Sequence, residues 1–298
     1  ALLIVFLLCI TTFAIALTLG GGPRATTLEV AIYQAIRLEF DLGRAGFLAI
    51  IQTGLCLIVA VAVMSMSTPS DTIRGIALRP DLTIRARRIA FYDKALIAVL
   101  TLFLASPLLA VLWRGVGGLL LLPEGLAGTT LRSLTLALSS AALVVLLAVP
   151  IAWGLAGLRR FAAAAEGAMM VTLTISPFVL AAGLFLLIRD YASPFAVALP
   201  MVVLVNALAA LPFALRALVA AFSNAERVEG RLAQTLGLRG WAMWRVVFWP
   251  HVRPALGLSA GLAAAVSMGA LGVIALFGST STQTWPFAML SLMGAYYR

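Results

Sequence analysis

The sequence predicts an all-α integral membrane protein that crosses the bilayer several times. Of its 298 residues, 63% are hydrophobic and 11% are charged, whereas an average soluble domain is about half apolar and a quarter charged. The apolar residues fall into separate runs, and each run approaches or exceeds the ~20 residues that a helix needs to cross the hydrocarbon core. The runs contain Gly and Pro and do not alternate in short segments, which argues against an outer-membrane barrel.

Seven membrane spans are predicted, and the cations between them give the orientation. The spans are 1–19, 45–66, 95–112, 133–158, 162–188, 195–220 and 255–277. Fourteen of the 21 Lys and Arg residues lie in 67–94, in the turn after 158 and in 216–253. The positive-inside rule places these three segments in the cytoplasm. The net charge of +10 is therefore attributed to cytoplasmic loops and not to nucleic-acid binding.

A faint internal repeat predicts that the chain combines parts of two related halves. Residues 17–21 align with 274–278, and 27–31 align with 284–288, each pair placing a short segment after an apolar helix. We expect 1–66 to be the C-terminal part of a first half, 67–94 to be a cytoplasmic linker, and 95–298 to be a second half. The apolar start and the odd number of spans predict a fragment that lacks its beginning and the last helix of the second half.

The segment before the last span is predicted to be a cytoplasmic helix-turn-helix. Gly237 and Gly240 enclose a short turn, because Gly adopts positive φ at low cost. A second amphipathic segment follows from Trp241 to Trp249. Such an element either rests on the membrane surface or docks on a partner protein, and the pattern alone leaves both open.

The spacing in this segment resembles the EAA loop of binding-protein-dependent ABC importer permeases. Nine residues separate Gly237 from the stretch Val247–Pro250, as in that loop. In the family the loop is a coupling helix that sits in a groove of the cytoplasmic ATPase. The resemblance assigns the three EAA positions to 231–233, so that Arg231 replaces the family's Glu. The implied coupling residues are Glu229, Arg231, Leu232, Ala233, Leu236, Gly237, Trp241 and Pro250.

The wider chain resembles the permeases of bacterial thiamine importers. The stretch 19–23 followed by 26–34 is similar to the external segment of the first half of those fused permeases. The resemblance implies the type I ABC importer permease fold in the inner membrane, and import of thiamine or its phosphates by alternating access. The implied partners are an ATPase dimer, a periplasmic solute-binding protein and membrane lipid. Fused permeases for ferric iron share this plan, so ferric iron or another small solute remains an alternative.

The chain is not expected to be an enzyme or to bind a cofactor. It lacks a Gly-rich phosphate loop with Lys followed by Ser or Thr, and Lys94 is its sole lysine, so a separate subunit is expected to hydrolyse ATP. Acidic residues avoid the centres of the predicted spans. This disfavours an ion-coupled secondary transporter and an intramembrane enzyme, which are the alternatives from other classes. His251 is interpreted as an interfacial polar residue and not as a metal ligand.

Five polar or aromatic residues are candidates for the substrate pathway: Asn206, Ser176, Tyr191, Ser267 and Trp285. Thiamine is a flat cation, and such a cation is suited to aromatic and hydroxyl groups. Each candidate also has an ordinary structural explanation. Asn206 can form hydrogen bonds between helices, the two serines can satisfy freed carbonyl groups, and the aromatic residues can anchor the chain at the membrane interface.

Overall fold

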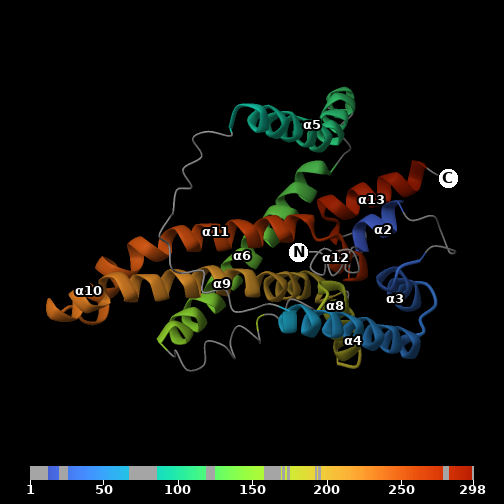
Figure 1. The fold of residues 1–298 in the computed structure, drawn as a ribbon. Helices are drawn as coiled ribbons and strands as arrows, with labels where there is room; N and C mark the ends of the chain where they lie inside the picture. Colours follow the sequence, from blue (N-terminus) through green and yellow to red (C-terminus); the bar gives the residue numbers. More distant parts are fainter. Residues whose placement is uncertain are drawn as a thin grey trace. The chain divides into compact units, whose positions relative to one another are not determined.

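The computed structural model describes residues 13–19, 26–66, 86–118, 125–157, 169, 172, 175–191, 193, 196–277 and 282–296. These residues form helices and the turns between them, and no β-strand occurs among them (Figure 1). The elements are α2 (Phe13–Leu19), α3 (Leu28–Arg37), α4 (Leu42–Met66), α5 (Ala86–Gly118), α6 (Leu126–Gly157), α8 (Pro177–Ile188), α9 (Ala198–Thr235), α10 (Gly240–Met243), the π-helix η2 (Trp244–Phe248), α11 (Trp249–Gly269), α12 (Leu271–Phe277) and α13 (Trp285–Tyr296).

Five of the helices in the described part of the chain are long and apolar enough to cross a membrane. The candidate spans are Leu42–Val59, Lys94–Val116, Leu126–Gly157, Ala198–Gly230 and Gly240–Gly269. Each contains most of one predicted apolar run, which confirms an all-α membrane protein. The runs 1–19 and 162–188 lie partly outside the described residues. Their described parts include α2 and the short apolar helix α8. The count of seven spans therefore stays a prediction.

The last predicted run, 255–277, is divided between two helices. α11 ends at Gly269, Ala270 leaves helical geometry with ψ of 88°, and α12 begins at Leu271. Most side chains of α12 are buried, including Ile274 and Phe277. The freed backbone groups therefore lie against protein, where a break in a membrane helix is tolerated.

The chain divides into two compact units, and α5 belongs to the smaller one, Ser67–Leu126. α5 has 33 residues with Pro107 inside it. Its described side chains from Lys94 to Val116 are almost all exposed. Exposed apolar side chains along a whole helix are typical of a surface that faces lipid or another helix.

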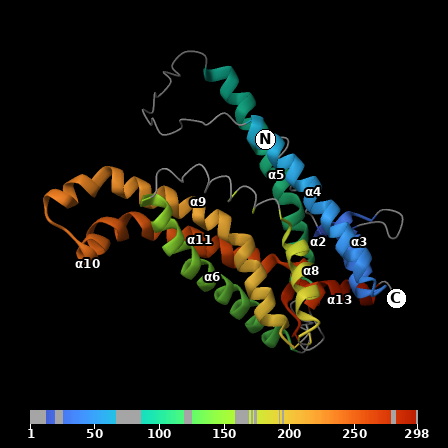
Figure 2. The ribbon, with the colours of Figure 1, turned by 90° about the horizontal axis from the view of Figure 1, so that it is seen from below.

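The larger unit contains two clusters of buried side chains, and α9 contributes to both. The first cluster joins α2, α3, α4, α8, α12, the start of α9 and Leu136 of α6. The second joins α6, α11, η2 and the rest of α9. Figure 2 shows α9 and α11 running alongside each other, and Figure 1 shows α6 crossing them obliquely. Their contact uses small residues such as Ala210, Ala214 and Ala263, which let membrane helices approach closely.

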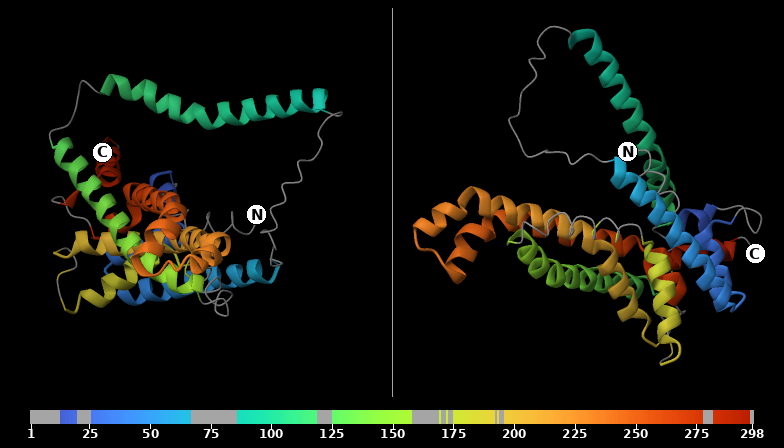
Figure 3. Two further views of the ribbon diagram at one scale, coloured as in Figure 1. Left: turned by 90° about the vertical axis from the view of Figure 1, so that its left-hand side faces the viewer. Right: turned by 60° about the horizontal axis from the view of Figure 1, so that its bottom comes forward.

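A tight turn connects α9 to α10, as the Gly pattern predicts. Gly237 and Gly240 have φ of 69° and 56°. Leu238 N–H donates to the carbonyl oxygen of Ala233 at 2.9 Å, which closes a Schellman C-cap around Gly237. The chain then returns through α10 and η2 directly into α11, so that a helical hairpin projects from the unit (Figure 3).

Candidate functional site

Two of the predicted pathway residues, Asn206 and Ser267, lie in one buried hydrogen-bond network. Asn206 Nδ2 donates to Ser267 Oγ at 2.9 Å, and Ser267 Oγ donates to Ser140 Oγ at 3.2 Å. Ser140 Oγ in turn donates to the carbonyl oxygen of Val203 at 3.5 Å. The network joins α6, α9 and α11. It therefore consists of hydrogen bonds between helices, which is the ordinary structural explanation given above for Asn206.

A third candidate, Ser176, belongs to a different buried cluster. It precedes α8 and caps it, because Phe178 N–H donates to Ser176 Oγ at 3.2 Å. The same hydroxyl donates to Glu29 Oε1 on α3. Gln52 on α4 donates from Nε2 to that oxygen at 3.0 Å. Three elements thus converge on one carboxyl group.

Glu29 and Gln52 are members of this cluster that were not among the residues predicted from the sequence. Glu29 lies in the first turn of α3, after the N-cap Thr27, and its side chain is buried. Burial raises the pKa of Glu29 above its ordinary value of 4.5, and the hydrogen bonds from Ser176 and Gln52 lower it by less. One signal was available in the sequence: Glu29 shares a helix face with Ile32 and Ile36, three and seven residues later.

The two aromatic candidates differ in their surroundings. Trp285 begins α13, and its backbone N–H donates to Ser133 Oγ on α6 at 2.9 Å. Its indole Nε1–H donates to Thr130 Oγ1 at 3.0 Å. Tyr191 follows α8 and is exposed. Among the described residues no hydrogen bond joins Tyr191, Trp285 and Asn206, so the structure does not assemble a single pathway site from them.

The predicted coupling segment forms the end of α9 and the turn that follows. Ala233 is buried, whereas Leu236 and Trp241 are 67% and 75% exposed. Arg231 and Leu232 lie in α9, and their side chains are outside the described part of the structure. Pro250 lies in the first turn of α11, directly after the π-helix η2. The turn therefore presents two large apolar side chains at an exposed tip.

Contacts behind this tip hold it to the rest of the larger unit. Glu229 Oε1 lies 3.6 Å from His251 Nε2, and His251 Nδ1 lies 3.0 Å from the carbonyl oxygen of Val247. These contacts give His251 a polar bridging role between α9 and α11. Among the described residues no group of three His, Cys, Asp or Glu side chains could hold a metal ion.

Aromatic rings from three helices also pack behind the tip. Trp244 and Phe248 of η2 contact Phe222 of α9 with centroid distances of 5.9 Å and 5.8 Å. Trp153 of α6 contacts Trp244 at 5.6 Å. Edge and tilted ring contacts of this kind stabilise packing beyond the burial of area. This aromatic cluster was not predicted from the sequence.

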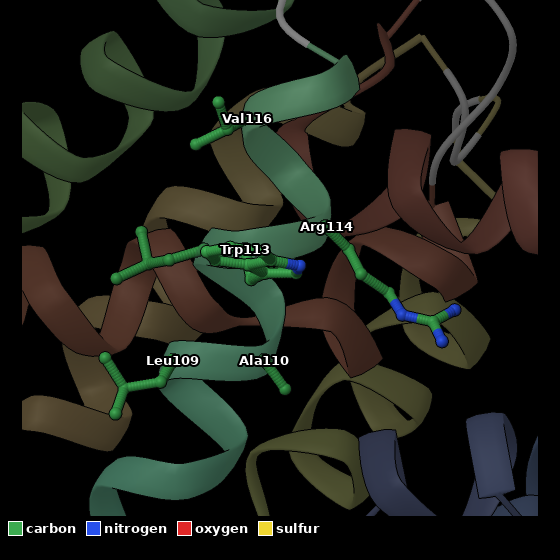
Figure 4. A pocket seen from close by; sticks show the side chains of 6 residues that line it. Leu109, Ala110, Trp113, Arg114 and Val116 are labelled. Atoms are coloured by element: carbon green, nitrogen blue, oxygen red, sulfur yellow. The ribbon is translucent and has the colours of Figure 1, made fainter.

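Two surface hollows in the described part of the chain do not include the predicted pathway residues. One hollow lies along α5, and its lining, including Leu109, Trp113 and Arg114, comes from that helix alone (Figure 4). A second runs between α6 and α9 past Arg132, Thr135 and Pro200. A binding pocket is normally enclosed by several elements, so the α5 hollow supplies no site.

Comparison with known proteins finds long and consistent matches. The thiamine transport system permease protein ThiP of Brucella abortus (strain 2308) is 37% identical over 301 residues, covering 98% of this chain and 55% of that protein. The proteins of the same name from Salmonella typhimurium (strain LT2) and Escherichia coli (strain K12) are 35% and 34% identical, each with 98% of this chain and 56% of the relative covered. The chain is homologous to part of these permeases. No protein-family model matches it.

The homology confirms the resemblance predicted from the sequence. The chain spans about half the length of the curated relatives it matches. Together with the five apolar helices, the match confirms a multi-pass protein of the bacterial inner membrane. The permease homologue thus contains a buried neutral network, a buried carboxyl cluster and an exposed apolar tip.

Proposed function

We propose that the chain is part of the transmembrane permease of an ATP-driven importer that moves thiamine or its phosphates from the periplasm to the cytoplasm. The observation that carries this proposal is the match of 98% of the chain to permeases named for thiamine transport. The five apolar helices supply the membrane-crossing part. Because the matched relatives are longer, the remainder of the permease would complete the pathway.

The proposed architecture is a type I ABC importer permease with two fused halves. In it, 1–66 belongs to the first half, 67–94 is the cytoplasmic linker, and 95–298 belongs to the second half. Seven transmembrane helices would belong to this part of the chain. The break between α11 and α12 adds support, because irregular backbone inside a membrane bundle often marks the pathway of a transporter.

An ATPase dimer is the proposed cytoplasmic partner, and the turn between α9 and α10 is its proposed docking site. Leu236 and Trp241 are exposed there, and large apolar side chains form the centre of many protein interfaces. The aromatic cluster and the contact between Glu229 and His251 connect the tip to α6, α9 and α11. ATPase closure would thereby move these helices and convert ATP hydrolysis into alternating access.

Uptake by the complete importer tests the function. The full-length permease would be purified with any bound ATPase, reconstituted in vesicles with the periplasmic binding protein, and supplied with labelled thiamine. We expect uptake that requires ATP. Uptake driven by an ion gradient without ATP would support the secondary transporter, and uptake of ferric iron but not of thiamine would support the alternative substrate.

A charge at the exposed tip tests the docking site. Leu236→Asp should abolish ATPase binding, because an unpaired charge would be buried in the interface. Arg231→Glu should weaken binding several-fold. Val228→Asp is the matched control, since Val228 is also exposed on α9 but lies outside the implied coupling residues. Affinities unchanged in both Leu236→Asp and Arg231→Glu would contradict docking here.

The turn geometry supplies a second test of coupling. At Gly237 a new Cβ would meet nothing within 4 Å, so the effect of Gly237→Val comes from its φ of 69°. A non-Gly residue in this region costs about 1–2 kcal/mol. We expect reduced uptake with normal membrane insertion. Gly261→Val is the control, because Gly261 also has open space and lies within helix α11.

A further inference from the structure

The carboxyl group of Glu29 is enclosed by polar side chains from two other elements. Glu29, Gln52 and Ser176 are 1%, 0% and 3% exposed. Both hydrogen bonds to the carboxyl group, from Gln52 Nε2 at 3.0 Å and from Ser176 Oγ, reach Oε1. Oε1 therefore acts as a carbonyl-type oxygen that uses both of its acceptor positions.

Two oxygens of the same cluster are buried without a hydrogen-bond partner. They are Glu29 Oε2 and Gln52 Oε1. Leaving such atoms unpaired is costly, most of all for a charged oxygen. The two atoms belong to the two side chains that the Gln52 N–H already joins. A proton on Glu29 Oε2 would make that oxygen a donor, and donation to Gln52 Oε1 would satisfy both atoms at once.

No described cation forms a salt bridge with the Glu29 carboxyl group. The elements that pack on α3 are α2, α4, α8 and α12. Of these, α2, α8 and α12 have no ionisable side chain. α4 has Arg44, which pairs with Glu39, and the buried thiol of Cys56. α3 itself adds Tyr33 and Arg37.

We infer that Glu29 is a proton-binding site, in which the neutral carboxylic acid and the Gln52 amide form a closed ring of two hydrogen bonds. The ring and the Ser176 bond join α3 to α4 and α8. Loss of the proton would place a buried carboxylate oxygen next to the amide oxygen without a donor between them, which would loosen α3. This inference uses the cluster alone and does not depend on the proposed substrate.

Infrared spectroscopy of the full-length permease tests the protonation directly. At neutral pH the wild-type protein should show the carbonyl band of a protonated carboxyl group, shifted in heavy water. The band should disappear in Glu29→Gln and persist in Glu39→Gln, the control at an exposed carboxylate. A wild-type spectrum without the band would overturn the inference.

Thermal unfolding at a series of pH values is the second test. Because the pKa of Glu29 is raised in the folded protein, the folded state holds a proton that the unfolded state releases above about pH 4.5. The Tm should therefore fall as pH rises from 4.5 toward the raised pKa. Glu29→Gln should remove this fall, since its N–H replaces the O–H, while Glu39→Gln keeps it. Identical pH dependence in wild type and Glu29→Gln would contradict the inference.

A double variant that exchanges Glu29 and Gln52 distinguishes loss of the hydrogen-bonded ring from simple misfolding. The double variant Glu29→Gln with Gln52→Glu moves the acid to α4 and keeps the ring, so both the infrared band and the pH dependence should return. A folded double variant that lacks them contradicts the ring. A wild-type Tm that rises with sodium at fixed pH, and does not in Glu29→Gln, would show that a metal cation and not a proton occupies the cluster.

Discussion

The two buried polar clusters of the larger unit differ in whether their hydrogen bonds are complete. In the first, Asn206, Ser267 and Ser140 donate in sequence, and the series ends at a backbone carbonyl oxygen. In the second, Glu29 and Gln52 each retain a buried oxygen without a partner. Helix packing explains a complete network of neutral groups. An incomplete network around an ionisable group indicates an additional bound species, such as a proton.

The largest effect is expected from removing the acceptor of the second cluster. Glu29→Leu would leave Gln52 Nε2 and Ser176 Oγ buried without their acceptor, at about 1–3 kcal/mol for each group. We expect a clearly lower Tm of the purified permease in detergent. Glu29→Gln is the matched control, because it preserves an acceptor at Oε1. Equal Tm values for the two variants would show that the cluster does not stabilise α3.

A smaller decrease in Tm is expected from a substitution in the first cluster. Asn206→Leu removes one interhelical bond, and Ser267 keeps its contact with Ser140. Such bonds in membrane proteins average about 0.6 kcal/mol, with a maximum near 2 kcal/mol. The decrease in Tm should be modest and the same at all pH values. In uptake assays a higher KM for thiamine with unchanged Tm would assign Asn206 to the substrate pathway instead.

The smallest effect should come from Thr284, whose buried Oγ1 also lacks a partner among the described residues. This hydroxyl is not ionisable at physiological pH, so no bound proton is needed to explain it. Thr284→Val keeps the shape and removes the unsatisfied oxygen, which should leave the Tm unchanged or raise it slightly. Ser133→Ala is the contrast, because it removes the acceptor of Trp285 N–H and should lower the Tm.

The helices and the turn at Gly237 could be predicted because their signals are local. Long apolar runs predict spans, and paired glycines at the end of an amphipathic segment predict a positive φ. The break at Ala270 was not predicted, since both α11 and α12 are apolar and one hydropathy window covers them.

The residues that form the two polar clusters could be predicted only in part, because their hydrogen-bond partners lie far away along the sequence. Asn206, Ser267 and Ser176 were selected as polar residues in apolar surroundings, but their partners lie far away along the chain. Glu29 has an ordinary local explanation, as an acid in the first turn of a helix. Its contacts with Gln52 and Ser176 cross 23 and 147 residues, and no local pattern encodes them.

The length of α9 gives it the properties of a lever arm. Its 38 residues span ~57 Å, almost twice the thickness of a hydrocarbon core. Its first residues belong to one buried cluster, and its last turn carries the exposed tip. A tilt of about 5° about one end of a helix this long displaces the other end by ~5 Å. A small rotation of α9 at its first residues would therefore move Thr235 by about the length of one helical turn.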